Sequence, residues 1–315
     1  MNERLQRWKL KNGTITLWPR WGRVGQVRVG GHDAFWANPT WKGDWNVGGD
    51  RLWVSPEVTW YCKSRNKLDS SQYFVPTAMD DGRWETQRRA PGCLEIRQRF
   101  TLRHHPARAG VRVEMARCFR IINLPDAPFF STHVAYHTDN DLWVRSRTVS
   151  APINLWSLIQ VPPGGELIIP CRTKPAFRAY FGPLDRRWWS VSGKTIRFRI
   201  TGQASYKIGV APDLVTGRIA YARPVGGARL VIYRAFFPQP WRDYCDVPPT
   251  ALKSRGDAVQ AYNDNGKLGG FGEVEYHSPA IDVKRGPSHV SDSCLTVVGL
   301  VRDRDWAGWL RQWLH

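Results

Sequence analysis

Short runs of alternating hydrophobic and polar residues cover most of the chain, and Gly, Pro, Asn and Asp separate them. Runs at about ten-residue spacing, with few helical windows between them, are typical of the strands of a large antiparallel sandwich. The clearest runs are GTITLW, VGQVRVG, LEIRQRFTL, VRVEMARCFRII, TIRFRITG, SYKIGVAP, ARLVIYRAFF, GEVEYHSPAI and CLTVVGLV. No internal repeat or low-complexity linker divides them. The pattern therefore predicts an all-β protein in which residues 1–315 form a single β-sandwich domain.

The last thirteen residues, DRDWAGWLRQWLH, follow a helical pattern instead. Trp306, Trp309, Leu310 and Trp313 recur at i, i+3, i+4 and i+7, which places them on one face of a helix. We expect a short C-terminal helix whose tryptophan stripe packs against a sheet.

The composition is that of a folded protein, with 42% hydrophobic residues and 17 tryptophans available for a core. No apolar run approaches the roughly 18 residues that a membrane helix needs. The N-terminus shows no export signal, so the expected location is cytoplasmic. The six cysteines are scattered without a CxxC pair, which favours buried thiols over disulfides or a zinc site. The sequence indicates neither a metal nor a cofactor.

A net charge of +19 makes a polyanion the first partner to consider. The basic residues are spread along the chain, and no nucleic-acid-reading motif accompanies them. Nucleic acid and membrane are therefore not the expected partners. The sequence carries no signal for an oligomeric state.

The segment RLWVSPE combines groups that suit a polyol. In an extended strand Arg51, Trp53, Ser55 and Glu57 share one face. Arg and Glu bind hydroxyl groups, and Trp stacks on the apolar face of a sugar ring. The alternative is an exposed face with an Arg–Glu pair, which adds little to stability.

The segment GGFGEVEYHSP places Glu273, Glu275 and His277 at alternate positions, on one face of a strand. Carboxylates about 5–7 Å apart raise the pKa of one of them, which leaves one base and one proton carrier. The preceding NDNG turn, with Asn263 and Asp264, and its glycine cluster allow the backbone to approach a ligand closely. The alternative is a solvated strand face.

Two further segments hold candidate residues. His133 and His137 share one face of STHVAYHTDND, and histidine exchanges protons near neutral pH. They lie about 13 Å apart on a strand, too far to share one metal ion. In NLWSLIQV, Gln160 is the only long polar side chain and needs partners if it is buried, whereas Trp156 is expected to be an ordinary core residue.

Four blocks in this order resemble an uncharacterised branch of the galactose-mutarotase-like (aldose 1-epimerase-like) proteins. They are GGDRLWVSPE, LWSLIQVPPGGELIIP, SYKIGVAPD and GDAVQAYNDNGKLGGFGEVEYHSPA, and they extend over most of the chain. The resemblance implies a large antiparallel β-supersandwich with a sugar site on a concave face.

The resemblance also implies roles for particular residues. Arg51 matches the sugar-binding arginine of the family, and Glu275 or Glu273 matches the general base. The strand that carries the family's histidine acid corresponds to NLWSLIQV, which has no histidine and has Gln160 near that place. His133, His137 and His277 are the remaining candidates for the acid.

Together these observations predict a carbohydrate-binding protein that anomerises or epimerises a sugar by Glu/His acid–base chemistry. The alternative is a binding module that lacks the general acid. A glycan hydrolase or lyase is disfavoured, since two glutamates on one strand face do not flank a glycosidic bond. The net charge favours an acidic sugar, such as a uronate or a sugar phosphate.

Overall fold

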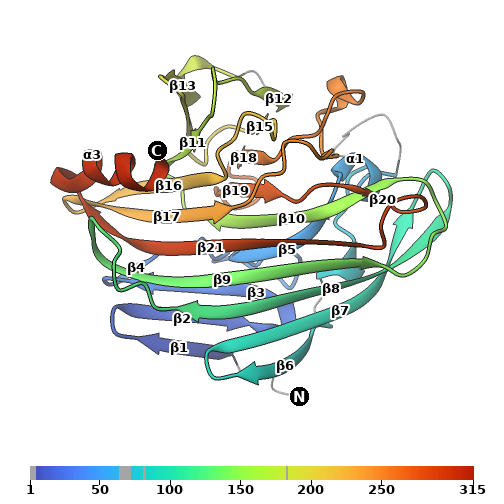
Figure 1. Ribbon diagram of the computed structural model, residues 1–315, viewed down its shortest axis with the longest axis horizontal. Coiled ribbons are helices and arrows are strands. Elements are labelled where there is room, and N and C mark those ends of the chain that lie inside the picture. Colours follow the sequence, from blue (N-terminus) through green and yellow to red (C-terminus); the bar gives the residue numbers. More distant parts are fainter. Residues whose placement is uncertain (1–4, 64–71, 81–82, 182–183) are drawn as a thin grey trace.

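The computed structural model describes residues 5–63, 72–80, 83–181 and 184–315. Within these ranges the chain forms two large antiparallel sheets (Figure 1), which confirms the all-β prediction. The first sheet, of eleven strands, has the order β1 (Gln6–Leu10), β2 (Gly13–Trp18), β3 (Arg23–Val29), β5 (Asp50–Ser55), β10 (Pro152–Val161), β19 (Gly272–His277), β18 (Val259–Asn263), β15 (Tyr206–Val210) and β12 (Arg178–Phe181), with β4 (His32–Asp33) on β3 and β20 (Ile281–Asp282) on β10.

The second sheet, of ten strands, has the order β13 (Trp189–Ser192), β14 (Thr195–Ile200), β11 (Gly165–Pro170), β16 (Arg218–Val225), β17 (Ala228–Phe236), β21 (His289–Arg302), β9 (Phe130–Val144), β8 (Ala109–Ile122), β7 (Cys93–His104) and β6 (Glu85–Ala90). Two single-turn helices, α1 (Glu57–Trp60) and α2 (Thr77–Asp80), follow β5. Short 3₁₀ turns occupy Pro19–Trp21, Arg186–Trp188, Pro249–Ala251 and Asp303–Asp305.

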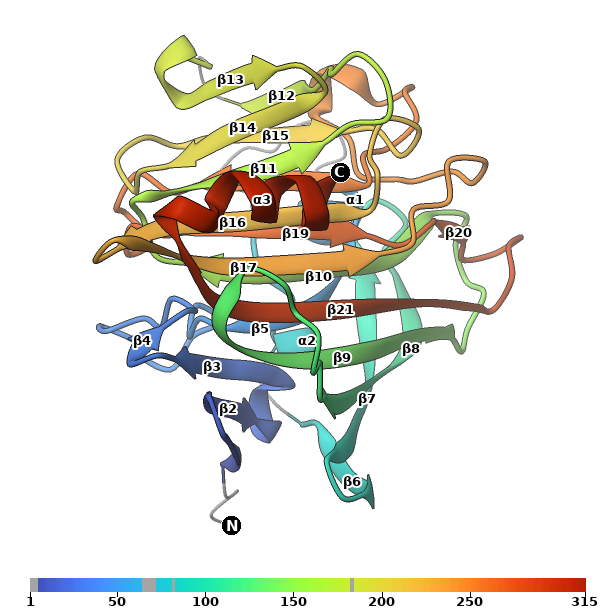
Figure 2. The ribbon, with the colours of Figure 1, turned by 60° about the vertical axis from the view of Figure 1, so that its left-hand side comes forward.

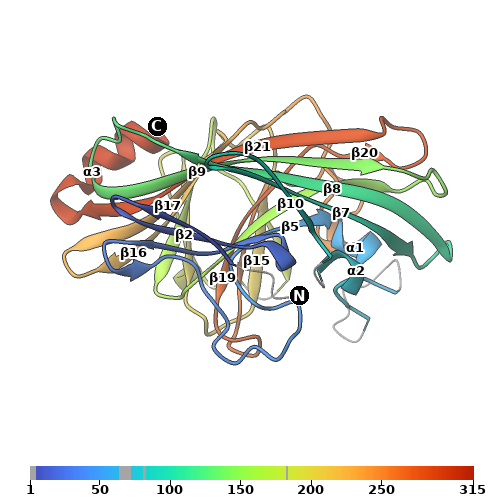
Figure 3. The same ribbon diagram turned by 90° about the horizontal axis from the view of Figure 1, so that it is seen from below.

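The hydrophobic core lies between the two sheets, which Figure 3 shows as two layers. Leu155, Ile159 and Val274 from the first sheet and Val134 and Val298 from the second belong to one continuous cluster of buried side chains. On β10 and β19 the neighbouring positions point the other way, so the first sheet has a second, outward face. We propose from the shared core that residues 1–315 form one domain.

A buried ion pair connects the sheets through this core. Arg117 of β8 lies 3.0 Å from the Asp50 carboxylate of β5, and both side chains are fully buried. The hydroxyl of Tyr136 on β9 donates a 2.7 Å hydrogen bond to the other oxygen of Asp50. Breaking a buried pair leaves an uncompensated charge, so these contacts hold the start of β5 firmly against the second sheet.

The C-terminal helix is present as predicted. It comprises α3 (Trp306–Trp309) and continues through Leu310–Leu314, and Figure 2 shows it lying across the second sheet. Trp309 is fully buried and contacts Phe130 and Tyr233, and the Trp313 indole donates a hydrogen bond to a backbone carbonyl. In the part of the chain described, no helix is long and apolar enough to cross a membrane.

The prediction of a strand through RLWVSPE is wrong in its second half. β5 ends at Ser55, Pro56 follows, and Glu57 begins α1. Proline has no N–H for a sheet ladder, and it precedes a helix well. Glu57 nevertheless faces the same side as Arg51, because the helical turn folds back over the outward face of the sheet.

Replacing Trp309 with Ala is expected to lower the free energy of unfolding by about 3–5 kcal/mol, since it removes a fully buried indole. Trp241→Ala is the matched control, because Trp241 is 67% exposed and its loss should change stability by less than about 0.5 kcal/mol. Urea denaturation followed by tryptophan fluorescence and circular dichroism measures both. If the protein unfolds in two separate transitions and Trp309→Ala lowers the stability of only one of them, the one-domain proposal is contradicted.

Candidate functional site

A cavity of about 450 Å³ opens on the outward face of the first sheet. Four charged side chains line it: Arg51, Glu57, Lys207 and Glu273. Eight aromatic side chains form most of its remaining wall: Trp45, Trp53, Tyr73, Trp156, Tyr180, Phe181, Tyr262 and Phe271. Aromatic walls with a few convergent polar groups are typical of small-molecule sites.

Strand register brings these residues together. The strands β5, β10, β19, β18, β15 and β12 are consecutive neighbours in the first sheet. Trp156 pairs with Trp53, Glu273 pairs with Tyr262, and Tyr262 pairs with Lys207. Directly opposite residues of antiparallel strands project from the same face. Residues that are more than 200 positions apart in the chain therefore meet.

Arg51 and Glu273 form a buried ion pair at one side of the cavity. The Arg51 Nη2 atom lies 2.6 Å from Glu273 Oε1. The guanidinium also lies 3.9 Å from the Trp53 ring centroid and 5.2 Å from that of Trp45. Within the described residues, Nε and Nη1 of Arg51 have no hydrogen-bond partner. Arg51 thus keeps two buried donors without a partner among these residues.

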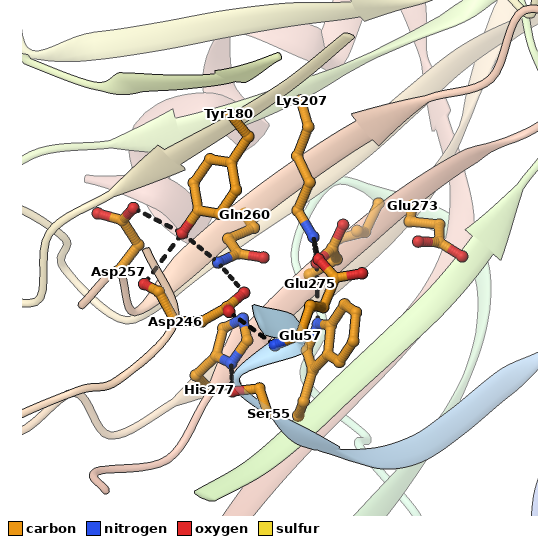
Figure 4. A network of polar contacts seen from close by, with 12 residues as sticks. Ser55, Glu57, Tyr180, Lys207, Asp246, Asp257, Gln260, Glu273, Glu275 and His277 are labelled. Atoms are coloured by element: carbon orange, nitrogen blue, oxygen red, sulfur yellow. Dashed lines mark hydrogen bonds and ion pairs between the residues drawn. The ribbon is translucent and has the colours of Figure 1, made fainter. Parts of the chain in front are cut away.

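Lys207 lies at the centre of a second charged group (Figure 4). Its Nζ atom is 3.0 Å from Glu57 Oε2 and 3.3 Å from Glu275 Oε2. It also lies 4.7 Å from the Trp156 ring centroid, and the Trp156 indole donates a 2.8 Å hydrogen bond to Glu275. The Tyr73 hydroxyl donates to the other oxygen of Glu57.

The buried charges shift one another's protonation. Burial raises the pKa of Glu275 to about 8 even though Lys207 opposes the shift, and Glu273 and Glu57 raise it further. Burial lowers the pKa of Lys207, but Glu275 and Glu57 outweigh burial and hold this pKa above its ordinary value. Near neutral pH, Lys207 is therefore a cation and Glu275 holds a proton.

A second group of polar residues lies beside Lys207 (Figure 4). Gln260 donates hydrogen bonds to the Tyr180 hydroxyl and to Asp246 Oδ2, at 2.6 and 2.8 Å. Tyr180 in turn donates to Asp257. Burial raises the pKa of Asp246 to about 7, and Glu57 contributes to the shift. These residues add a second carboxyl group that titrates near neutral pH.

The structure brings several of the predicted site residues into one place. Arg51, Trp53, Glu57 and Glu273 line the cavity, and Glu275 lies directly behind its wall, in contact with Lys207 and Trp156. Between the two glutamates, Glu273 is the one that reaches the cavity surface. This placement assigns them different environments, which the sequence left open.

His277 does not line this cavity. Its ring stacks on Trp156 at 5.6 Å, and its Nδ1 atom lies 3.1 Å from the Ser55 hydroxyl (Figure 4). Burial and, secondarily, Lys207 lower the pKa of His277 well below its ordinary value. It is a neutral side chain that supports the Trp156 wall, and it does not fit the role of an acid in contact with a sugar.

Gln160, Asn263 and Asp264 hold loops and do not contact the cavity. Gln160 donates a 2.9 Å hydrogen bond to Asn46. Asn263 accepts hydrogen bonds from two backbone N–H groups after β14, and Asp264 Oδ2 accepts three from its own loop. That loop carries Leu268 to the rim. The expectation that these three residues bind substrate is corrected: their polar atoms are engaged in positioning the wall.

His133 and His137 lie elsewhere. Both are on β9 of the second sheet and project away from the core side, on which Val134 packs. The His133 Nε2 atom lies 3.0 Å from the Leu124 carbonyl, and His137 contacts Asp139. The expectation that one of them acts as the acid is corrected, because the whole core separates them from Glu273.

Sequence reasoning missed Lys207 and the role of Trp156. Lys207 lies in the apolar run YKIGV, and a lysine within a buried strand needs a carboxylate partner, which was the available signal. Trp156 was expected to be an ordinary core residue, but its indole N–H bonds Glu275 and its ring lines the cavity. Trp45 and Tyr73 lie in loops outside any strand pattern, and no motif in the neighbouring sequence indicates that they line a cavity.

The expectation of an acidic sugar is also corrected. It required a basic cavity, but two cations and two carboxyl groups line this one, so the arginine surplus of the chain lies elsewhere. Among the described residues, no three His, Cys, Asp or Glu side chains lie close enough to share a metal ion.

The raised pKa of Glu275 predicts a pH dependence of stability. Between about pH 5 and pH 8 the folded state keeps a proton that the unfolded chain has lost, so the free energy of unfolding falls as pH rises, by up to about 1.4 kcal/mol per pH unit. Glu275→Gln removes this proton and should flatten the slope. Asp246, with its raised pKa, contributes a slope of the same sign up to about pH 7, and His277, with its lowered pKa, contributes one of opposite sign below about pH 6.5; both remain in the variant.

Urea denaturation at intervals from pH 5 to pH 8 measures the slope. Glu166→Gln is the matched control, because Glu166 pairs with Arg197 at the surface of the other sheet. An unchanged slope in Glu275→Gln contradicts the assignment of the proton to Glu275.

Comparisons with known proteins agree with this architecture. A galactose mutarotase-like protein from Lactobacillus casei is 12% identical, with a TM-score of 0.50 over 94% of this chain and 99% of that one. A galactose mutarotase related enzyme from Lactobacillus acidophilus is 7% identical, with a TM-score of 0.54 over 95% and 99%. At such identities the likeness shows the fold, which is galactose-mutarotase-like, as the sequence blocks implied.

A search of curated proteins finds no match. The model of one protein family, described as a family of unknown function (DUF6786), matches residues 32–294. This match spans most of the chain and includes every side chain that lines the cavity. The chain therefore belongs to this family of unknown function (DUF6786), and its fold is galactose-mutarotase-like.

Proposed function

We propose that the protein binds a sugar in the cavity of the first sheet and interconverts its anomers. The observation that carries the proposal is the convergence of Arg51–Glu273 and Lys207–Glu57 on one cavity with aromatic walls. Charged groups bind hydroxyls, and aromatic rings cover the apolar C–H faces of a pyranose.

Glu273 is suited to be the base. It lines the cavity, and its Oε1 atom lies 2.6 Å from Arg51 Nη2. Its second oxygen, Oε2, accepts no hydrogen bond from the described residues. Glu273 would take the proton of the anomeric hydroxyl as the bond between C1 and the ring oxygen breaks, which gives the open-chain aldehyde.

Lys207 is suited to supply the proton to the ring oxygen. It lines the cavity from β15, and Glu275 lies 3.3 Å behind it with a proton to replace the one donated. Rotation about the C1–C2 bond, closure of the ring and return of both protons then yield the other anomer. In this proposal Lys207 and Glu275 take the acid role, since none of the described histidines lines the cavity.

A second candidate function is sugar binding without turnover. It is favoured by the pairing of Lys207 with Glu57 and Glu275, which raises the pKa of Lys207 and makes its ammonium group a weaker acid. The two functions share one binding site and differ in the rate of anomer exchange, so a measurement of that rate separates them.

Binding is tested by calorimetric titration with a panel of aldohexoses and aldopentoses. Trp45→Ala removes an aromatic wall that packs on Trp53 and is expected to weaken binding about tenfold. Trp41→Ala is the matched control, because Trp41 is on the same loop and packs on Trp21, outside the cavity. If no sugar of the panel binds, the proposed function is wrong.

Turnover is tested by NMR exchange spectroscopy of the two anomers of a sugar that binds. The wild type should accelerate exchange, and Glu273→Gln should slow it at least about 100-fold, because the amide cannot accept the proton. Glu166→Gln should leave the rate unchanged. Binding without acceleration in the wild type establishes the second candidate function instead.

A further inference from the structure

Two cysteines on the second sheet have their sulfur atoms in contact. Cys93 begins β7 and Cys118 lies on β8, and these neighbouring strands lie next to the edge strand β6 (Figure 1). Their Sγ atoms are 3.2 Å apart, and both side chains are free thiols. No other pair of described cysteines has its sulfur atoms in contact. The fold thus creates a thiol pair that the spacing of the cysteines along the sequence does not indicate.

Strand register explains this contact. Cys93 lies opposite Arg120 in the β7–β8 ladder, two residues from Cys118, so the two cysteines are diagonal neighbours. Leu94 and Phe119 belong to the hydrophobic core, and successive residues of a strand project to opposite faces. Both thiols therefore lie on the outward face of the second sheet, where diagonal neighbours come within reach of each other.

The pair also differs from the other cysteines in exposure. Of the six cysteines, all of which the structure describes, Cys62, Cys171 and Cys294 are buried. The other three, which include Cys93 and Cys118, are partly exposed. A small oxidant reacts first with thiols that it can reach.

Cys245 is the third partly exposed cysteine, and it has no sulfur neighbour. Its Sγ atom lies 3.9 Å from the Ser55 hydroxyl instead. Exposure and contact with a second thiol therefore coincide only at Cys93 and Cys118.

We propose that Cys93 and Cys118 are a redox modification site, at which a hydroperoxide converts the two thiols into a reversible disulfide. The sulfur atoms of a disulfide are about 2.05 Å apart, so the pair must close by only about 1.2 Å. The site is on the opposite sheet from the cavity, and the inference does not depend on the proposed sugar chemistry.

The reaction consumes one hydroperoxide molecule and proceeds in two steps. Burial raises the pKa of Cys118 to about 12, which keeps this sulfur protonated at neutral pH, so Cys93 reacts first. The Cys93 sulfur attacks hydrogen peroxide, the O–O bond breaks, and Cys93 becomes a sulfenic acid while its proton leaves in a water molecule. The Cys118 sulfur then attacks the Cys93 sulfur. The S–S bond forms, the S–O bond breaks, and the hydroxyl leaves as water with the Cys118 proton. The two thiols together lose two electrons, which the peroxide accepts.

The disulfide would fasten the beginning of β7 to β8 beside the edge of the sheet. A cross-link restricts the unfolded chain more than the folded one, in which the two sulfur atoms are already close. The oxidised protein should therefore unfold at a higher urea concentration than the reduced protein.

The test uses the full chain, first reduced, then freed of reductant and treated with hydrogen peroxide. Thiol titration of the unfolded product should fall from six free cysteines to four, and dithiothreitol should restore six. Peptide mapping without reductant should show Cys93 linked to Cys118. The pair should oxidise at least about tenfold faster than Cys245, because a neighbouring thiol held in place captures the sulfenic acid.

Variants locate the modification. Cys93→Ser and Cys118→Ser should each abolish the link, and Cys118→Ser should leave a Cys93 sulfenic acid that dimedone traps. Cys171→Ser is the matched control, because Cys171 is buried elsewhere, and it should retain the link. Circular dichroism verifies that each variant is folded, and the wild-type peptide map tests the proposal even if one is not. Oxidation of the wild type in urea should give mixed pairings, since the fold no longer holds the two sulfur atoms together.

Six free thiols after treatment overturn the proposal. A link to another cysteine, a link between two chains, or sulfinic acid at Cys93 without a link overturns it as well. A Cys93–Cys118 link that forms without raising the urea midpoint contradicts its role in fastening the edge of the sheet.

Discussion

The site depends on the burial of one ammonium group. Lys207 is only 3% exposed, and a buried ammonium is tolerated only when carboxylates lie against it. Glu57 of α1 provides the carboxylate, and the carboxyl group of Glu275 on β19 lies 3.3 Å away. Both elements are far from β15 in the sequence. The need to neutralise Lys207 thus fixes how the short helix after β5 packs on the sheet, and with it the position of one cavity wall.

The same requirement explains the unusual protonation of the site. Carboxyl groups that surround two cations exceed them in number, so burial retains a proton on Glu275 and raises the pKa of Asp246 as well. Such a group is poised to exchange protons near neutral pH, which is the range in which acid–base chemistry on a sugar is useful. In this site, carboxyl and ammonium groups stand where a histidine was expected.

Rigidity comes from the side of the sheet that faces the core. Arg117 and Asp50 pair across the two layers directly beside Arg51, and Tyr136 holds the second oxygen of Asp50. The strand that carries Arg51 and Trp53 is therefore anchored from behind. A binding group held by a buried network loses little freedom when a ligand arrives, and this preorganisation favours affinity.

The sequence by itself determined the two-sheet fold, the terminal helix and the shared face of Glu273, Glu275 and His277, because strand and helix periodicity are local properties. It also identified Arg51 and Trp53 as candidate site residues. It did not determine which glutamate reaches the cavity, that Lys207 lines the same cavity, or that His133 lies beyond the core. Those facts follow from which strands become neighbours, and strand order is set by packing over the whole chain. The balance of charge around the cavity was likewise hidden, since a total of +19 describes the whole chain, whereas buried charges respond only to what lies within a few ångströms.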